Sequence, residues 1–114
     1  MIVNLGKYKS HSTTVFTGRP QGKQVRDELG LDKIDKSKEI VTFIIPEDTS
    51  SINPSFFLGL LFESYKFLKD KFLEKYKFEY LTSNPETKRV LEKNIEDGLR
   101  NANNSLNINF NNLL

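Results

Sequence analysis

Apolar residues fall into short alternating or continuous runs that predict four strands. These runs cover residues 1–5, 13–16, 39–46 and 76–81. The third run is the most apolar, and it ends at Pro46, where a missing N–H costs no ladder hydrogen bond. The polar residues 6–12 separate the first two runs, and this spacing predicts a hairpin between them.

Capping residues mark three helices between and after these runs. The first follows the turn-forming residues 17–22 and is expected to end at Gly30. Asn53 followed by Pro54 is typical of an N-cap and a first helical position. Residues 83–86 read Ser-Asn-Pro-Glu, which matches a capping box at the start of the third helix.

Helical periodicity supports the second and third helices. The second has an apolar stripe made of Phe57, Leu61, Leu68 and Phe72. The third has four-residue spacing at Leu91, Ile95 and Leu99. Residues 31–38 are mostly charged and are predicted to be a connection.

The tail, residues 101–114, is rich in asparagine. Within it Leu106, Ile108 and Phe110 alternate with asparagine, a period of two that favours a final edge strand.

The resulting order, β-β-α-β-α-β-α with a C-terminal edge strand, predicts one α/β domain over residues 1–114, with its core at about 13–100. Right-handed crossovers imply a mixed, mostly parallel sheet. Helices that follow parallel strands begin at the same sheet edge, so we expect Arg19, Ser55 and Asn84 to share one rim.

Composition narrows the classes of function. The 17 basic and 15 acidic residues leave a net charge of +2, which argues against a nucleic-acid partner. The chain has no cysteine and one histidine, His11, to which we assign no role, so no metal or cofactor is expected. No leader-like or membrane-spanning run is apparent, and we expect a cytoplasmic protein without a membrane partner.

Two helix entries carry a family resemblance. Residues 17–22, followed by Val25 and Leu29, look like a Ser-Arg entry into a first helix. Residues 52–56, Ile-Asn-Pro-Ser-Phe, look like an Ile-x-x-Ser-Phe entry into a second. On these motifs the chain resembles the STAS-like family of unknown function, which is related to the STAS and bacterial anti-sigma factor antagonist superfamily, over about residues 13–100.

The resemblance implies a small regulatory module that binds proteins and is not an enzyme. Antagonists of the superfamily are switched by a GHKL-type kinase at a serine that begins the corresponding helix. Ser55 is the residue of this chain that matches that serine. The resemblance therefore implies phosphorylation of Ser55 by a GHKL-type ATPase or kinase partner.

Ser55 also has a plainer interpretation as a first-turn serine that helps to cap its helix. Phosphorylation would add about −1.5 to −2 charges there, and a helix N-terminus tolerates that charge.

Six consecutive or near-consecutive apolar residues, 56–58 and 60–62, occupy most of the circumference of the second helix. Some of them must be covered by another element or by a partner. We expect Asn53, Phe56, Leu58 and Phe62 to contact a protein partner, with a homodimer as one form of that contact.

Arg19, Lys23 and Arg26 form one basic stripe on the first helix. A solvated face is the plainer interpretation, and an anion contact at Arg19 is the alternative. The rim around Arg19, Ser55 and Asn84 leaves open a second hypothesis, a sensor of a small ligand or nucleotide. A third hypothesis, an enzyme using Glu47 or Asp48, has the weakest support, since no nucleophile–base pair accompanies these carboxylates and no catalytic residue is assigned.

Overall fold

The strands of the protein form two separate parallel sheets. The computed structural model describes residues 1–9 and 14–113, with side chains up to residue 106, so His11 lies outside the described residues. A three-stranded sheet has the order β1-β3-β5. Its strands are β1 (Ile2–Asn4), β3 (Val41–Ile45) and β5 (Tyr76–Tyr80). A second, two-stranded sheet pairs β2 (Val15–Phe16) with β4 (Ser51–Ile52).

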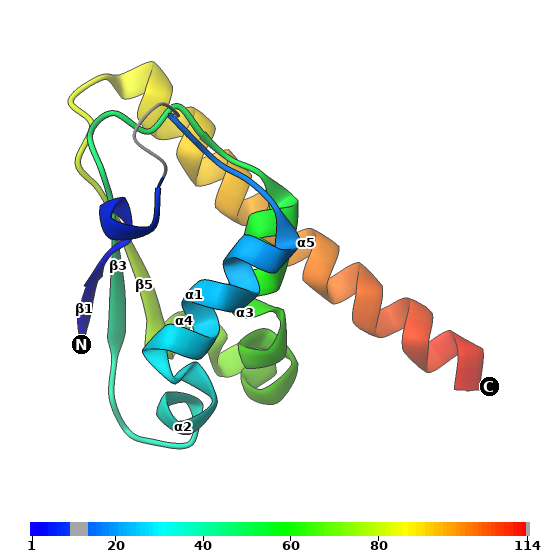
Figure 1. Ribbon diagram of the computed structural model, residues 1–114. Helices are drawn as coiled ribbons and strands as arrows, with labels where there is room; N and C mark the ends of the chain where they lie inside the picture. Colours follow the sequence, from blue (N-terminus) through cyan, green and yellow to red (C-terminus); the bar gives the residue numbers. More distant parts are fainter. Residues whose placement is uncertain (10–13, 114) are drawn as a thin grey trace.

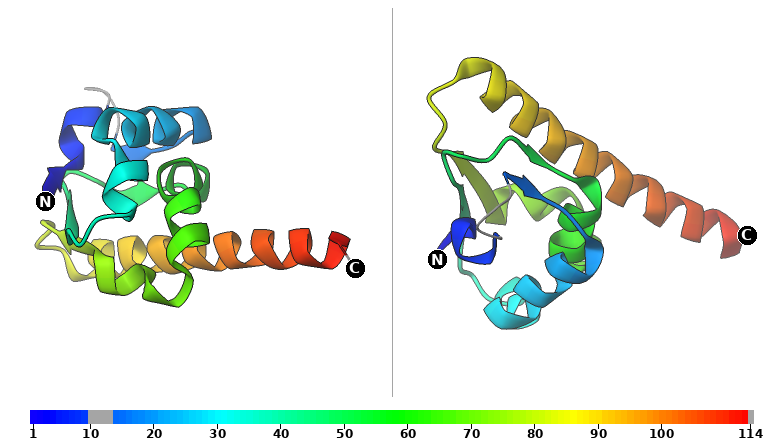
Figure 2. Two further views of the ribbon diagram at one scale, coloured as in Figure 1. Left: turned by 90° about the horizontal axis from the view of Figure 1, so that it is seen from below. Right: turned by 45° about the horizontal axis from the view of Figure 1, so that its top comes forward.

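The helices lie on one side of the three-stranded sheet (Figure 1). They are α1 (Arg19–Leu29), α2 (Leu31–Asp35), α3 (Pro54–Leu68), α4 (Phe72–Lys75) and α5 (Pro85–Leu113). Two further views show the same arrangement, with the three-stranded sheet at one margin and the helices beside it (Figure 2). The protein is therefore an α/β fold with open parallel sheets, which confirms the predicted α/β class. The strands form two parallel sheets, whereas the prediction was one mixed sheet.

The predicted hairpin between the first two strands is wrong. β1 leads into a 3₁₀ turn, η1 (Leu5–Tyr8), which the Asn4 side chain caps by accepting from the Gly6 N–H at 2.8 Å. β1 then pairs with β3 and β2 pairs with β4, both in parallel. The two strands therefore belong to different sheets and are not paired with each other.

The stop of the first helix is confirmed, and the connection after it is not. Gly30 takes the left-handed conformation, with φ 68° and ψ 40°, and its N–H caps the last carbonyls of α1. The chain then turns directly into α2, although residues 31–38 were predicted as a connection. Leu31 is fully buried and Ile34 packs on the core, so an i, i+3 apolar pair holds this short helix in place.

The start of α3 is confirmed, and its predicted length is too great. Asn53 is the N-cap and Pro54 the first helical residue. Lys69 has φ 52° and ψ −121°, which ends α3 and begins the 3₁₀ turn η2 (Lys69–Lys71). Phe72 is buried as expected, but it belongs to α4 and not to the stripe of α3.

The tail is helical and not an edge strand. α5 runs to Leu113, and its far end extends away from the rest of the protein (Figure 1). Ala102 is fully buried and Leu106 half-buried, so the stripe of Leu91, Ile95 and Leu99 continues with helical spacing. The asparagines between apolar residues gave a misleading period of two.

The core lies between the three-stranded sheet and the helices. Val3, Phe43 and Phe78 lie side by side across β1, β3 and β5 and face the helices. The ring of Phe43 stacks on those of Tyr76 and Phe78, at centroid distances of 6.0 and 5.9 Å. Aromatic stacking across adjacent strands thus fixes the register of the sheet.

Candidate functional site

The starts of α1 and α3 meet at the carboxyl edge of the two-stranded sheet. β2 leads into α1 and β4 leads into α3, and because the strands are parallel both helices start at the same edge. The Gly18 N–H, at the N-cap of α1, donates to Ser55 Oγ at 3.2 Å. Arg19 and Ser55 therefore share a rim, as the sequence predicted.

The hydroxyl of Ser55 is fully engaged. It accepts from Gly18 and donates to Asn53 Oδ1 at 2.8 Å, while the Ser55 N–H donates to the same oxygen at 2.9 Å. The N–H groups of Phe56 and Phe57 donate to the Asn53 carbonyl at 3.0 and 3.2 Å. These two N–H groups are therefore not free to bind a phosphate on Ser55, because they already donate within the first turn of α3.

Asn84 does not belong to this rim. It caps α5, since its side chain accepts from the N–H groups of Glu86 and Thr87. Asn84, and not Ser83, is therefore the N-cap, which corrects the predicted capping box. The Ile52 N–H at the end of β4 donates to Asn94 Oδ1. Asn84 lies ten residues before Asn94 in the chain, which is about 15 Å along α5 at 1.5 Å per residue. Asn84 is therefore far from the end of β4, where α3 begins.

Glycine contacts hold α1 close against α3. A Cβ on Gly22 would lie 2.3 Å from the Phe56 carbonyl oxygen, and one on Gly59 would lie 2.1 Å from the Arg19 carbonyl oxygen. Only glycine at both positions lets the two backbones approach this closely. α1 therefore covers much of the apolar circumference of α3 that the sequence left without a neighbour.

A shallow groove remains between α1 and α3. It encloses about 310 Å³ and is bordered by Arg19, Lys23, Leu58, Phe62 and Glu63, among other residues. The Arg19 guanidinium carbon lies 5.8 Å from the centre of the Phe62 ring, within cation–π range. We call this feature the α1–α3 groove. Its border carries both basic and acidic side chains around the apolar pair Leu58 and Phe62; the acidic ones are Asp27, Asp32 and Glu63.

The four residues expected to contact a partner separate into two groups. Phe56 is 2% exposed and packs on Phe16 at 5.2 Å, so it belongs to the core and its predicted role is corrected. Leu58 and Phe62 are half-buried and border the α1–α3 groove, and Asn53 is exposed at the helix cap. Ser55, Leu58 and Phe62 are spaced i, i+3 and i+7, along one face of α3.

Arg26 is not part of a solvated basic face. It is buried, and its guanidinium donates to the Leu60 carbonyl, to Ser64 Oγ and to two carboxylates. The carboxylates are Asp35 at 3.0 Å and Asp32 at 2.7 Å. Burial alone would lower the pKa of Arg26, but the hydrogen bonds to Asp32 and Asp35 outweigh it, and the pKa is raised.

Asp35, Ser64 and Tyr76 complete this buried cluster, and sequence reasoning missed all three. Ser64 Oγ donates to Asp35 Oδ2 at 2.6 Å, and the Tyr76 hydroxyl donates to Asp35 Oδ1. Burial, followed by the bond to Asp35, raises the pKa of Tyr76. The cluster joins α1, α2, α3 and β5, and its members are too far apart in sequence to form a local motif.

The acidic pair of the enzyme hypothesis lies in the loop after β3. Asp48 forms an ion pair with Lys9, and the hydrogen bond from Lys9 lowers the pKa of the Asp48 carboxyl, which makes it a weaker base. Glu47 is exposed. Among the described residues, no three histidine or acidic side chains come together in a way that would hold a metal ion.

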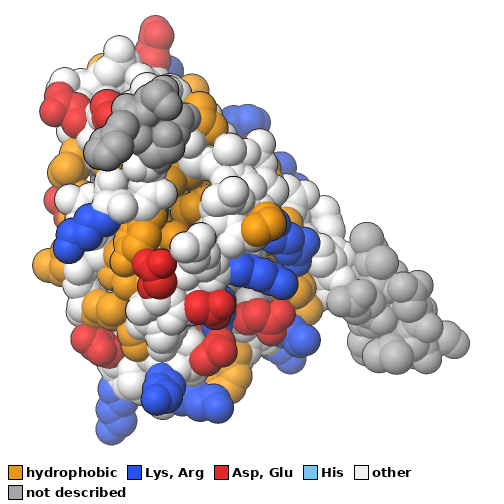
Figure 3. Space-filling model, viewed as in Figure 1, with side chains coloured by type: hydrophobic (Ala, Val, Ile, Leu, Met, Phe, Trp, Pro, Cys, Tyr) orange, Lys and Arg blue, Asp and Glu red, His pale blue; other side chains and the backbone are white. Residues whose placement is uncertain are grey.

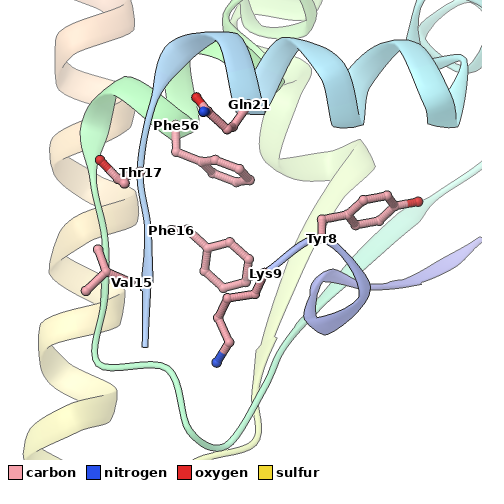
Figure 4. Close-up of a pocket in the computed structure, with 7 residues that line it drawn as sticks. All are labelled: Tyr8, Lys9, Val15, Phe16, Thr17, Gln21 and Phe56. Carbon is pink, nitrogen blue, oxygen red and sulfur yellow. The ribbon is translucent and has the colours of Figure 1, made fainter. Parts of the chain in front are cut away.

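A second hollow lies between η1 and α1. It encloses about 330 Å³ and is bordered by Tyr8, Lys9, Val15, Phe16, Thr17, Gln21 and Phe56 (Figure 4). The rings of Phe16 and Phe56 form its floor, and the Lys9 ammonium lies 6.0 Å from the centre of the Phe16 ring. Hydrophobic side chains gather between the strand layer and α1 on this face of the molecule (Figure 3).

Comparison of the chain with protein-family models, with curated proteins and with solved structures finds no match. The STAS-like resemblance therefore rests on the two helix-entry motifs and stays a prediction. Within the part of the chain that the structure describes, none of the helices has the length and apolar character needed to cross a bilayer.

Proposed function

We propose that this protein is a small, non-enzymatic regulatory module of STAS-like type that binds a protein partner reversibly through the α1–α3 groove. The observation that carries the proposal is the position of Ser55. Its hydroxyl ties α3 to the start of α1, and it lies on the same helix face as Leu58 and Phe62. A modification of that hydroxyl would alter the end of the groove directly.

The chemistry of the groove suggests the kind of partner. Leu58 and Phe62 offer half-buried apolar surface. Arg19 and Lys23 add positive charge at its border, where a carboxylate of a partner can bind, and Asp27 and Glu63 add negative charge. A partner segment with an apolar side chain next to a carboxylate fits this combination. Phosphate on Ser55 would compete with that carboxylate for the same cations, so modification would weaken binding.

The resemblance suggests the modifying enzyme, a GHKL-type kinase. Transfer of a phosphoryl group to Ser55 Oγ removes the hydroxyl proton and ends the bond to Asn53 Oδ1. The Gly18 N–H remains as a donor to the new group, and Arg19, the next residue along the chain, supplies a cation at the start of α1. The Ser55 hydroxyl must leave its present hydrogen bonds before it can react, so a kinase would act on an opened helix cap.

Capture of a partner from a lysate of the source organism, followed by calorimetry with the purified partner, tests the proposal. Phe62→Asp should weaken binding because it places a carboxylate in the apolar part of the groove. Phe67→Asp is the matched control, since Phe67 is 57% exposed on the same helix and outside the groove. Equal affinities for the two variants would refute the groove as the binding surface.

The switch has a separate test. Ser55→Asp should weaken the partner by about 5–150-fold, a coupling of about 1–3 kcal/mol, whereas Ser55→Ala should bind but resist switching. Mass spectrometry after treatment with the kinase should find phosphate on Ser55. Phosphate on other hydroxyls alone, with unchanged affinity of Ser55→Asp, would leave Ser55 as a capping residue.

A small-ligand sensor is the second candidate, and the hollow between η1 and α1 is the observation that favours it. Its floor of the Phe16 and Phe56 rings would suit a small aromatic ligand. A thermal-shift screen with small aromatic acids and with nucleotides would separate these classes. Phe16→Ala is unsuited as a test, since Phe16 is a core residue, and Gln21→Ala at the exposed border is preferable.

A further inference from the structure

Within residues 1–9 and 14–113, no helix or strand covers the outer face of the three-stranded sheet. The helices lie on the opposite face, and none in the described chain crosses the outer one (Figures 1 and 2). Parallel sheets occur almost only where both faces are covered, because their connections place helices on them. This sheet is parallel throughout and is covered on one face alone.

Exposed apolar side chains concentrate on that outer face. Strand alternation points Ile2 and Ile44 away from the helices. Ile40 directly precedes β3 and Leu81 directly follows β5, and the same alternation, continued by one residue, assigns both to this face. Ile2 is 77% exposed, and Ile40 and Leu81 are each 48% exposed, while Ile44 is half-buried. Backbone bonds from Thr42 to Met1 and from Leu81 to Ile45 continue the ladder to both ends of this surface. Exposed apolar side chains gathered on one face in this way are typical of an interaction surface.

The side chains of the same face, polar and apolar, form two rows across the sheet. One row is Ile2–Thr42–Lys77 and the next is Asn4–Ile44–Glu79. Lys77 and Glu79 are exposed, two residues apart on the same edge strand, and so about 7 Å apart. The face therefore carries one positive and one negative charge, and its net charge is zero.

We propose that this outer sheet face binds a second copy of the chain, forming a two-fold symmetric dimer. The two-fold axis lies between the two sheets, parallel to their planes and perpendicular to the strands, at the level of Phe43 and Phe78. Rotation about it places each row of one copy opposite the other row of the second copy. Lys77 then lies opposite Glu79 of the second copy, and the reciprocal pair forms by symmetry. A strongly charged partner would gain nothing from a neutral face, whereas a second copy satisfies both charges.

Sedimentation velocity over a range of concentrations tests the proposal. Wild type should form a reversible dimer that weakens as salt rises, because the pairs at the sheet edge are screened. Lys77→Glu and Glu79→Lys should each raise the dissociation constant about tenfold or more, and the double variant should restore it. Recovery of dimerisation in the double variant would show that the two residues pair between copies. Loss of the hydrogen bond that Lys77 donates to the Leu73 carbonyl of its own chain would not be repaired by the second substitution.

Two further variants act as a matched pair. Ile2→Lys adds charge to the proposed interface, and Val90→Lys adds it to an apolar side chain of α5 that is 45% exposed outside the sheet. Ile2→Lys should yield monomer and Val90→Lys should not, with circular dichroism showing that both fold. A wild-type monomer at every concentration, or a dimer that the sheet variants leave unchanged, would overturn the proposal. Phe62→Asp should leave the dimer intact, which keeps this test independent of the α1–α3 groove.

Discussion

Replacement of Arg26 by methionine should destabilise the protein severely. Methionine keeps much of the side-chain length but leaves the buried Asp35 carboxylate with only Ser64 and Tyr76 as donors. The side chains of Arg26 and Asp35 are 7% and 4% exposed, so their charges meet out of contact with water. Removing one partner of such a pair costs about 3–5 kcal/mol, a large part of the 5–15 kcal/mol typical of a small domain.

The second carboxylate on the same guanidinium provides the control. The Asp32 side chain is 80% exposed, and exposed ion pairs contribute about 0–1 kcal/mol. Asp32→Asn should therefore leave stability nearly unchanged, even though its bond to Arg26 is the shorter of the two. Burial, and not distance, decides which pair matters.

Urea unfolding followed by circular dichroism measures the free energy of unfolding for each variant. The Arg26→Met, Asp35→Asn double variant should recover part of the loss, because no charge is then left buried without a partner. The reasoning fails if Arg26→Met costs less than about 1 kcal/mol, or if Asp32→Asn costs as much as Arg26→Met.

Two further predictions concern packing and pH. Gly59→Ala should cost about 1–3 kcal/mol or more, because its Cβ would meet the Arg19 carbonyl oxygen at 2.1 Å and push α1 from α3. Gly30→Ala, whose Cβ would meet no atom within 4 Å, should cost only about 1 kcal/mol for its left-handed backbone, and equal losses in thermal melts would contradict the close-contact argument. Burial, and then the charges of Glu92 and Glu96, raises the pKa of Tyr80 to about 12 from an ordinary 10.0. The contribution of this raised pKa to the free energy of unfolding is fully present below pH 10 and is lost as pH rises toward 12. Tyr80→Phe should therefore lose less stability at alkaline pH than wild type in urea titrations, and parallel pH profiles of the two proteins would refute this.

Local sequence signals located the helix boundaries that depend on neighbouring residues. Asn53 and Pro54 start α3 and Gly30 ends α1 as predicted, since caps act within one turn. The sequence also predicts β3 well, because the apolar run matches a strand whose inward residues are buried along its whole length. Local signals also predict that Arg19 and Ser55 lie at the same sheet edge, since each residue lies at the start of a helix that follows a strand.

Long-range pairing was beyond local signals. The separate β2–β4 sheet carries the start of α3 away from the end of β3, which is why Asn84 does not join Ser55. Arg26 fitted a basic stripe, and only the fold brings Asp35 and Ser64 to it. The helical tail was misjudged because alternating asparagines obscured a stripe that continues through Ala102.

The position of the buried cluster constrains how a switch at Ser55 can work. Near Ser55 the two helices touch through the Gly18–Ser55 bond and the glycine contacts, and farther along them Arg26 binds the Leu60 carbonyl and Ser64. A phosphate on Ser55 can therefore disturb the first turns of α1 and α3 while the Arg26 end of both helices stays fixed. The expected response is a local change in the charge and shape of the α1–α3 groove without global unfolding. Ser55→Asp should then bind the partner more weakly at a nearly unchanged melting temperature. A large fall in that temperature would instead mean that the Gly18–Ser55 bond is needed for folding, and the switch would have to act by unfolding the helix starts.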